Sequence, residues 1–191
     1  ARLSVREVAK KGTVLVGFHE KRSSFIADMK SCEILPKRVS DLLVPLRELI
    51  NSLTLRKKIP QIELAVTDEA LALVLRVLEK PTTEDEAKLR QFQEDYGVDF
   101  WYQPKGPDSI YLMDPENANR LKLHHRETGV EVVFRPTDFT QVNHRLNEVM
   151  VTRALRLLHL EPSSKVIDFF CGLGNFTLPL ATRTAKVLGI E

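Results

Sequence analysis

Cysteine is scarce in this sequence, and long apolar runs are missing from it. Cys32 and Cys171 are the only two cysteines among 191 residues, and they lie in widely separated segments. This spacing argues against a disulfide-stapled secreted domain and is typical of proteins from a reducing cytoplasm. No apolar run approaches the ~18 residues that a membrane-spanning helix requires. We therefore expect a cytoplasmic protein without a membrane partner.

The sequence has only a small excess of positive charge, with a formal net charge of +2. The charged residues are, however, unevenly distributed along the chain. Residues 1–60 contain 13 Lys and Arg against 6 Asp and Glu, whereas residues 61–191 contain 15 against 20. A basic first third suggests contact with a polyanion such as RNA, although a solvated basic face explains the charge equally well. Candidate phosphate contacts stand at the predicted turns Lys10-Lys11, Lys21-Arg22 and Arg56-Lys57-Lys58.

Residues 1–135 predict an α+β domain. Alternating apolar and polar residues over 1–7, 13–19 and 23–29 indicate three strands of an antiparallel meander. Helical spacing over 38–53 predicts a helix, and Pro45 inside it is expected to kink the helix or to split off a first turn. Further strands are expected at 61–66, 71–78 and 99–104, and a helix at 84–96 with a capping box at its start and Gly97 at its end.

Residues 136–191 have a different pattern. Asn143 is suited to cap a helix, and residues 165–170 form the short apolar run of a buried parallel strand. A glycine turn, a helix over 176–184 and a second strand over 185–191 complete the opening β-α-β unit of a nucleotide-binding sheet. Because two strands cannot bury these apolar runs, we expect a piece of a longer protein. The expected fold class is α/β, with an α+β central domain ahead of an incomplete Rossmann-like domain.

The glycine turn carries the strongest chemical signal. Gly172 and Gly174 allow a tight turn and close approach of a ligand to the backbone. Glu191 ends the next strand, 19 residues after Gly172, where a carboxylate can bind both ribose hydroxyls of an adenosine. A glycine pair alone is common in structural turns. The strand before it, the helix after it and the acidic residue together favour a nucleoside-cofactor site.

The residues around the turn favour S-adenosylmethionine (AdoMet) over a dinucleotide. A dinucleotide fingerprint has a small residue three positions after the second glycine, and Thr177 stands there instead. AdoMet has no phosphate and carries a positive charge on sulfur, which suits Asp168 at the end of the preceding strand. The alternative role for Asp168 is to cap the turn through backbone N–H groups.

Three stretches resemble the RNA 5-methyluridine methyltransferases, a class I methyltransferase family. They are RPTDFTQVN at 135–143, VIDFFCGLGNFTLPLA at 166–181 and SSFIADMKSCEILP at 23–36, and the last favours the bacterial branch that methylates 23S ribosomal RNA. The resemblance implies transfer of a methyl group from AdoMet to C5 of a uridine in 23S rRNA. A transfer-RNA methyltransferase and a non-catalytic RNA-binding module at 1–135 are the alternatives. No protein partner is predicted.

In the resembled family a cysteine thiolate adds to C6 of the uracil, C5 takes the methyl group, and a carboxylate removes the C5 proton. The resemblance places both groups after Glu191, so no catalytic residue is assigned here and residues 1–191 alone are expected to be inactive. Cys171 lies in the glycine turn and is not that nucleophile. The residues expected to bind AdoMet are Gln141, Asp168, Phe170, Gly172, Gly174, Asn175 and Glu191. Structural alternatives are a core role for Phe170, a helix cap for Asn175 and a loop role for Gln141.

Cys32 precedes a proline-containing helix start. The resemblance implies that it is one of four ligands of a [4Fe–4S] cluster in the longer protein, with the other three supplied by a segment upstream. A cluster of this kind needs four thiolates. In residues 1–191 the alternative for Cys32 is a half-buried free thiol.

Overall fold

The computed structural model describes residues 1–117 and 119–191, and the chain forms two compact units, Ala1–Ala118 and Asn119–Glu191. The division between these units falls earlier in the sequence than the domain boundary expected at residue 135. Residues 119–134 belong to the second unit because their hairpin packs on the helix that follows it. In the part of the chain that the structure describes, no helix is long and apolar enough to cross a membrane.

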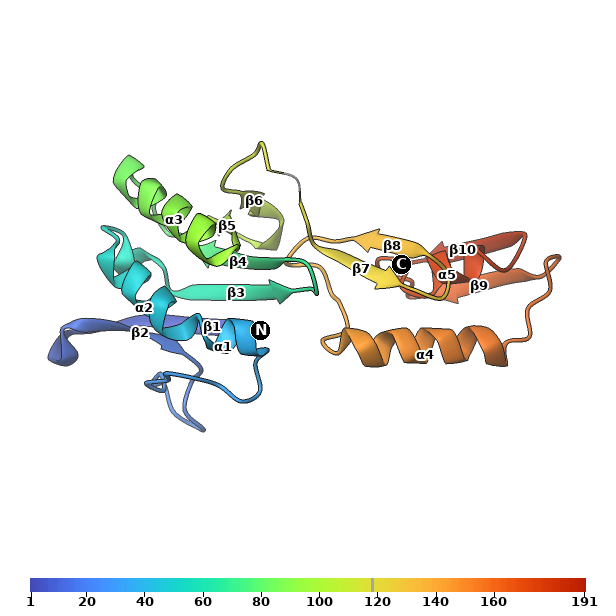
Figure 1. The fold of residues 1–191 in the computed structure, drawn as a ribbon, viewed down its shortest axis with the longest axis horizontal. Coiled ribbons are helices and arrows are strands. Elements are labelled where there is room, and N and C mark those ends of the chain that lie inside the picture. Colours follow the sequence, from blue (N-terminus) through green and yellow to red (C-terminus); the bar gives the residue numbers. More distant parts are fainter. Residues whose placement is uncertain (118) are drawn as a thin grey trace. The chain divides into compact units, whose positions relative to one another are not determined.

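The first unit is built on a six-stranded sheet in the order β2-β1-β3-β4-β5-β6 (Figure 1). Its strands are β1 (Arg2–Val8), β2 (Thr13–Gly17), β3 (Gln61–Val66), β4 (Leu71–Arg76), β5 (Asp99–Gln103) and β6 (Tyr111–Leu112). Neighbouring strands are antiparallel except β4 and β5, which are parallel. The expected antiparallel sheet is thus interrupted once, because a helix carries the chain from β4 back to the start of β5.

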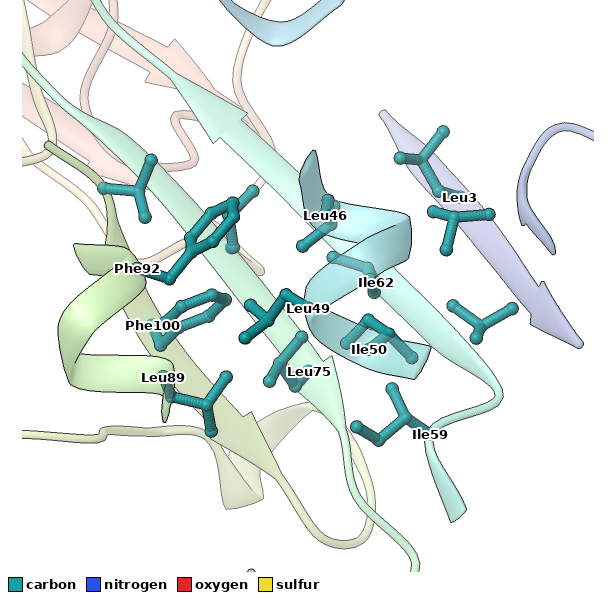
Figure 2. Packing of buried hydrophobic residues seen from close by; sticks show 14 of the residues in the cluster. Leu3, Leu46, Leu49, Ile50, Ile59, Ile62, Leu75, Leu89, Phe92 and Phe100 are labelled. Carbon is teal, nitrogen blue, oxygen red and sulfur yellow. The ribbon is translucent and has the colours of Figure 1, made fainter. Parts of the chain in front are cut away.

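Helices α2 (Leu43–Ser52) and α3 (Thr83–Tyr96) cover one face of this sheet (Figure 1). Figure 2 shows side chains from both helices against those of the strands, in a core that includes Leu46, Ile50, Leu89, Phe92, Leu3, Ile62, Leu75 and Phe100. Short 3₁₀ turns occur at Ala9–Lys11, Arg56–Lys58 and Pro107–Ser109. The apolar stripe predicted over 38–53 is therefore the part that anchors α2 to the sheet.

The third strand expected in the first unit is not formed. Residues 23–29 make a single β-bridge, His19 to Ile26, and the Met29 carbonyl at the end of the segment accepts a hydrogen bond from Arg47. The edge of β1 that is not bonded to β2 pairs with β3. Of the two outcomes expected at Pro45, the split-off first turn is seen: α1 (Lys37–Ser40) is separate from α2. Pro45 lies in the first turn of α2, where its missing N–H removes no helical hydrogen bond.

The capping box at the start of α3 is confirmed. Thr82 Oγ1 accepts from the Asp85 N–H, and the Asp85 carboxylate accepts from the Thr82 N–H. The same fully buried carboxylate accepts from the N–H and hydroxyl of Thr54, at 2.7 and 2.6 Å. Asp85 therefore ties the start of α3 to the segment that follows α2.

The second unit begins with a hairpin that the sequence reading did not identify. Its strands are β7 (Lys122–His125) and β8 (Val130–Val133). Glu127 at the hairpin turn forms ion pairs with Arg156 at 3.0 Å and with Arg183 at 3.2 Å. The alternation of buried Leu121 and Leu123 ahead of a Thr-Gly turn is the signal that could have predicted it.

The β-α-β unit predicted at the end of the chain is present. It comprises β9 (Lys165–Phe169), α5 (Thr177–Ala181) and β10 (Lys186–Ile190), with β9 and β10 as parallel neighbours, and it follows helix α4 (His144–Leu157). Asn143 caps α4 by accepting from the Leu146 N–H at 3.0 Å. Helix α5 is shorter than the 176–184 expected. A small core of Val151, Leu155 and Leu180 joins α4 to α5, with Val166 and Val187 against it.

Candidate functional site

The turn between β9 and α5 forces three residues into the left-handed region of backbone space. They are Phe170 at φ +61°, Gly172 at +51° and Gly174 at +87°. The Cys171 N–H donates to the Ile190 carbonyl of β10 at 3.1 Å, which ties the turn to the neighbouring strand. Because a left-handed conformation is costly for a bulky residue, the strain at Phe170 marks the turn as a candidate functional site.

The two glycines of the motif have different surroundings. A Cβ at Gly172 would meet nothing within 4 Å, so this side of the turn faces open space. A Cβ at Gly174 would meet Leu178 Cγ at 2.9 Å, so only glycine allows α5 to approach the turn so closely. Gly172 therefore leaves room for a ligand beside the backbone, whereas Gly174 is required by packing.

Glu191 lies beside the glycine turn, as the 19-residue spacing predicted. Its Oε2 accepts a hydrogen bond from the Gly172 N–H at 2.6 Å. The carboxylate therefore closes the turn with one oxygen, and its Oε1 has no recorded partner among the described residues. Each carboxylate oxygen has two acceptor lone pairs, so Oε1 and the second lone pair of Oε2 stay available to a ligand while the turn stays closed.

Asp168 accepts a hydrogen bond from the Thr177 hydroxyl at 2.5 Å. The structure records no backbone N–H bonded to its carboxylate among the described residues, so the expected alternative of a turn cap is not seen. Asp168 is half-buried, and Thr177 holds it at the end of β9 beside the turn. The Thr177 side chain that argued against a dinucleotide thus has a local structural role.

Asn175 is bonded to a residue that the sequence reading missed. Its carboxamide and that of Asn147 exchange two hydrogen bonds, at 2.7 and 2.9 Å. Asn147 belongs to α4 and is 5% exposed. Its position one helical turn before Val151, on the buried stripe of α4, was the signal available in the sequence.

Gly189 is a second residue that the sequence reading missed. It lies on β10 opposite Asp168, and a Cβ there would meet Cys171 Sγ at 2.9 Å and Thr177 Oγ1 at 3.2 Å. Only a residue without a side chain lets the turn lie this close to β10. Gly189 lies outside the glycine-turn motif of residues 168–176.

The remaining predicted residues are placed differently. Phe170 lies in the turn, and its side chain is 90% exposed, so it does not pack in the core of the described residues. Gln141 is exposed, and among the described residues the structure shows no contact between Gln141 and the turn. The structure thus brings together Asp168, Gly172, Gly174, Asn175 and Glu191, and leaves the side chains of Phe170 and Gln141 open.

The two cysteines belong to different units, and both are free thiols. Cys32 is half-buried against the core of the first unit, and its N–H donates to Ser40 Oγ at 2.8 Å. Among the described residues, no group of three or more His, Cys, Asp or Glu side chains is arranged to hold a metal ion. In the chain Cys32 is thus a half-buried free thiol.

A parallel strand pair joined by a glycine turn and a helix, with an acidic residue at the end of the second strand, defines the start of a class I, Rossmann-like methyltransferase domain. The fold of the whole chain matches the crystal structure of Pyrococcus abyssi tRNA (uracil-54, C5)-methyltransferase in complex with S-adenosyl-L-homocysteine. The TM-score is 0.69 at 18% identity, covering 99% of this chain and 47% of that one. The model of the tRNA (uracil-5-)-methyltransferase family matches residues 13–191, and the chain belongs to this family.

Curated relatives match the chain over its full length. Proteins named 23S rRNA (uracil(1939)-C(5))-methyltransferase RlmD from Cupriavidus necator, Ralstonia pickettii and Burkholderia pseudomallei are 57%, 56% and 58% identical to it. The chain covers 43%, 42% and 41% of their respective lengths. It therefore spans less than half the length of these relatives.

Proposed function

We propose that the protein containing this chain transfers a methyl group from AdoMet to C5 of a uridine in 23S ribosomal RNA, in the cytoplasm. The observation that carries the proposal is the closed glycine turn, where Glu191 accepts from the Gly172 N–H at 2.6 Å beside open space. Membership of the uracil-5-methyltransferase family supports the reaction class. The names of relatives 56–58% identical to the chain support 23S rRNA, and the uridine numbered 1939 in those names, as the target.

The residues of the turn fit an adenosine-containing cofactor. The second carboxylate oxygen of Glu191 can accept from a ribose hydroxyl, and the open side of Gly172 lets the nucleoside approach the backbone. Asp168 supplies negative charge near the end of β9, which suits a cationic sulfur. AdoMet itself supplies an electrophilic methyl group. The role of this part of the protein is thus to bind and orient the methyl donor.

We assign neither cysteine of the chain as the nucleophile that attacks C6 of the uracil. Cys171 lies against Gly189, and Cys32 belongs to the other unit. The thiolate and the carboxylate base of the family resemblance correspond to positions after Glu191. Residues 1–191 would then bind the methyl donor but would not complete the methyl transfer.

Cys32 is our proposed ligand for a [4Fe–4S] cluster in the longer protein. A cluster needs four thiolates, and the first unit supplies Cys32 alone, so the residues of this chain do not fit a cluster by themselves. The support is a half-buried thiol whose backbone N–H is fixed by Ser40. Iron and sulfide analysis of the full-length protein and its Cys32→Ala variant, purified without oxygen, tests it. Equal iron in both proteins would remove Cys32 from the ligand set.

Methyl transfer is tested with radiolabelled AdoMet, the full-length protein, and either 23S rRNA or tRNA from cells that lack uridine C5 methylation. We expect label in 23S rRNA, none in tRNA, and background incorporation when residues 1–191 replace the full-length protein. Label in tRNA alone would establish the second candidate, tRNA methylation, which the description of the matched family favours. Salt-dependent RNA binding without label in either RNA would instead support a non-catalytic RNA-binding module.

A further inference from the structure

Two carboxamides, one on α4 and one in the glycine turn, form a closed pair. Asn147 Nδ2 donates to Asn175 Oδ1 at 2.7 Å, and Asn175 Nδ2 donates to Asn147 Oδ1 at 2.9 Å. The residues lie 28 positions apart in the sequence, and Asn147 is 5% exposed whereas Asn175 is half-buried. The buried side chain of Asn147 on α4 therefore fixes the position of the half-exposed side chain of Asn175 in the glycine turn.

Packing alone does not explain a polar residue at position 147. Asn147 precedes Val151 and Leu155 on the buried stripe of α4, where an apolar side chain would satisfy the small core. Replacing two hydrogen-bonded buried groups by apolar groups of similar shape is often nearly neutral for stability. The pair does, however, give the Asn175 amide a defined plane, which apolar packing would not provide.

The pair leaves part of Asn175 free to bind a ligand. A carboxamide has two N–H donors and two acceptor lone pairs, and the pair uses one of each. The second N–H and the second lone pair of Asn175 stay available beside Gly174. In contrast, a carboxamide without a partner rotates broadly about its terminal torsion. Pairing with Asn147 thus presents one donor and one acceptor in fixed directions at the turn.

We propose that Asn147 is a positioning residue for the methyl donor, acting through Asn175; this inference rests on the proposed function of the glycine turn. Helix α4 starts after its cap Asn143, two residues beyond Gln141. The pair therefore connects the turn to the helix that follows Gln141, another residue predicted to bind AdoMet. Loss of the pair should weaken binding of the donor more than binding of RNA.

The test uses the full-length protein and calorimetric titration with S-adenosylhomocysteine. Asn147→Leu should raise the Kd roughly tenfold, which is the change expected when one hydrogen bond to the ligand is lost. The KM for AdoMet should rise in parallel while the KM for RNA stays unchanged. Asn147→Asp keeps an acceptor for Asn175 Nδ2 but sets a second acceptor against Asn175 Oδ1, so it should also weaken binding of the donor.

Asn119→Leu is the matched control. Asn119 lies in the same unit and also makes two hydrogen bonds, to the Phe134 carbonyl at 2.7 Å and from the Leu121 N–H at 3.0 Å. Its loss should lower the melting temperature without changing the Kd. In an Asn175→Ala background, Asn147→Leu should add nothing to the Kd, because the residue through which it acts is gone.

The outcomes separate the two proposals. If the wild-type protein does not bind S-adenosylhomocysteine, the proposed function fails. If the wild type binds and Asn147→Leu binds equally well, or if its effect persists in the Asn175→Ala background, the positioning role is overturned and the proposed function stands. Should the Leu variant not fold, the Asp variant and the Asn147→Ala/Asn175→Ala cycle give the same decision.

Discussion

Glu191 combines a structural and a binding role in one side chain. Oε2 accepts a hydrogen bond from the Gly172 N–H, which holds the turn against the end of β10. The proposed binding role uses Oε1 as an acceptor for the ligand. The sequence reading expected the carboxylate to serve two ribose hydroxyls. In the structure Oε2 accepts from the Gly172 N–H with one of its two lone pairs, so both oxygens can still accept from ribose hydroxyls while that contact is kept.

Replacing Glu191 in the full-length protein tests its role in binding. We expect Glu191→Ala to raise the Kd for AdoMet roughly 30- to 150-fold, the range for lost hydrogen bonds to a charged acceptor. Glu191→Gln keeps an acceptor for the Gly172 N–H and should give a smaller loss. Calorimetric titration measures both. The exposed Glu161 serves as control, and an affinity that is unchanged in Glu191→Ala would remove this residue from the site.

Gly189 provides a steric test of the same turn. Gly189→Ala places a methyl group 2.9 Å from Cys171 Sγ, which requires the turn to move away from β10. We expect a loss of about 1–3 kcal/mol in the free energy of unfolding, as for other overpacked sites. Denaturant unfolding of the chain measures it. Adding Cys171→Ala removes the sulfur and should recover part of the loss; equal stability of Gly189→Ala and wild type would contradict the packing described.

At the scale of elements, Asp85 is the main polar link between α3 and the segment after α2. Burial on its own would raise the pKa of its carboxyl, but the hydrogen bonds donated by Thr54 and Thr82 outweigh burial and hold the pKa below its ordinary value. A carboxyl whose folded-state pKa is lowered stabilises the fold above its unfolded-state pKa. The first unit should therefore lose stability as the pH falls below about 3.8 and through the lower folded-state pKa.

The variant that tests this link is Asp85→Ala. It leaves the N–H groups of Thr54 and Thr82 without their acceptor, and we expect a loss of about 3 kcal/mol in unfolding free energy near neutral pH. Asp85→Asn cannot titrate, so its stability should fall less steeply between pH 5 and 2, a range of about one unit or more on either side of the ordinary value. Urea unfolding at a series of pH values measures both. A wild-type acid response in Asp85→Asn would assign the loss to other groups.

At the scale of the whole molecule, the basic first third divides into paired and unpaired cations. Lys57 pairs with Glu7 at 3.0 Å, and Lys58 pairs with Glu79. Lys21 and Arg22 are exposed, and no ion pair is recorded for them among the described residues. The local charge excess is therefore concentrated in fewer positions than the sequence count indicates, and only part of it is available to phosphates.

RNA binding should depend on these unpaired cations. If Lys21 and Arg22 each contact a phosphate, Lys21→Ala/Arg22→Ala should flatten the plot of log affinity against log salt by about 1.4, at about 0.7 per contact for single-stranded RNA. Lys57→Ala/Lys58→Ala, the control with paired charges, should change the slope less. Filter binding across a salt series measures both. Binding that is absent at low salt would identify the basic face as solvated.

The sequence by itself determined the features that depend on near neighbours in the chain. The capping box at Thr82, the cap at Asn143 and the strand–turn–helix–strand order of 165–191 are all present as predicted. Hydrogen bonds within a few residues, and apolar periodicity within one element, decide these features, so a short window of sequence contains the information. The spacing of Glu191 from Gly172 belongs here too, because one β-α-β unit brings the two together.

Only the tertiary structure decided which distant segments meet. Residues 23–29 have the alternation of a strand, yet they make only the bridge from Ile26 to His19, and the Met29 carbonyl accepts a hydrogen bond from Arg47 of α2. The Asn147–Asn175 pair and the space required at Gly189 likewise join residues that no local pattern connects. The physical reason is that a segment can pair with several distant segments whose local sequences suit it about equally well. The packing of the assembled unit decides among them.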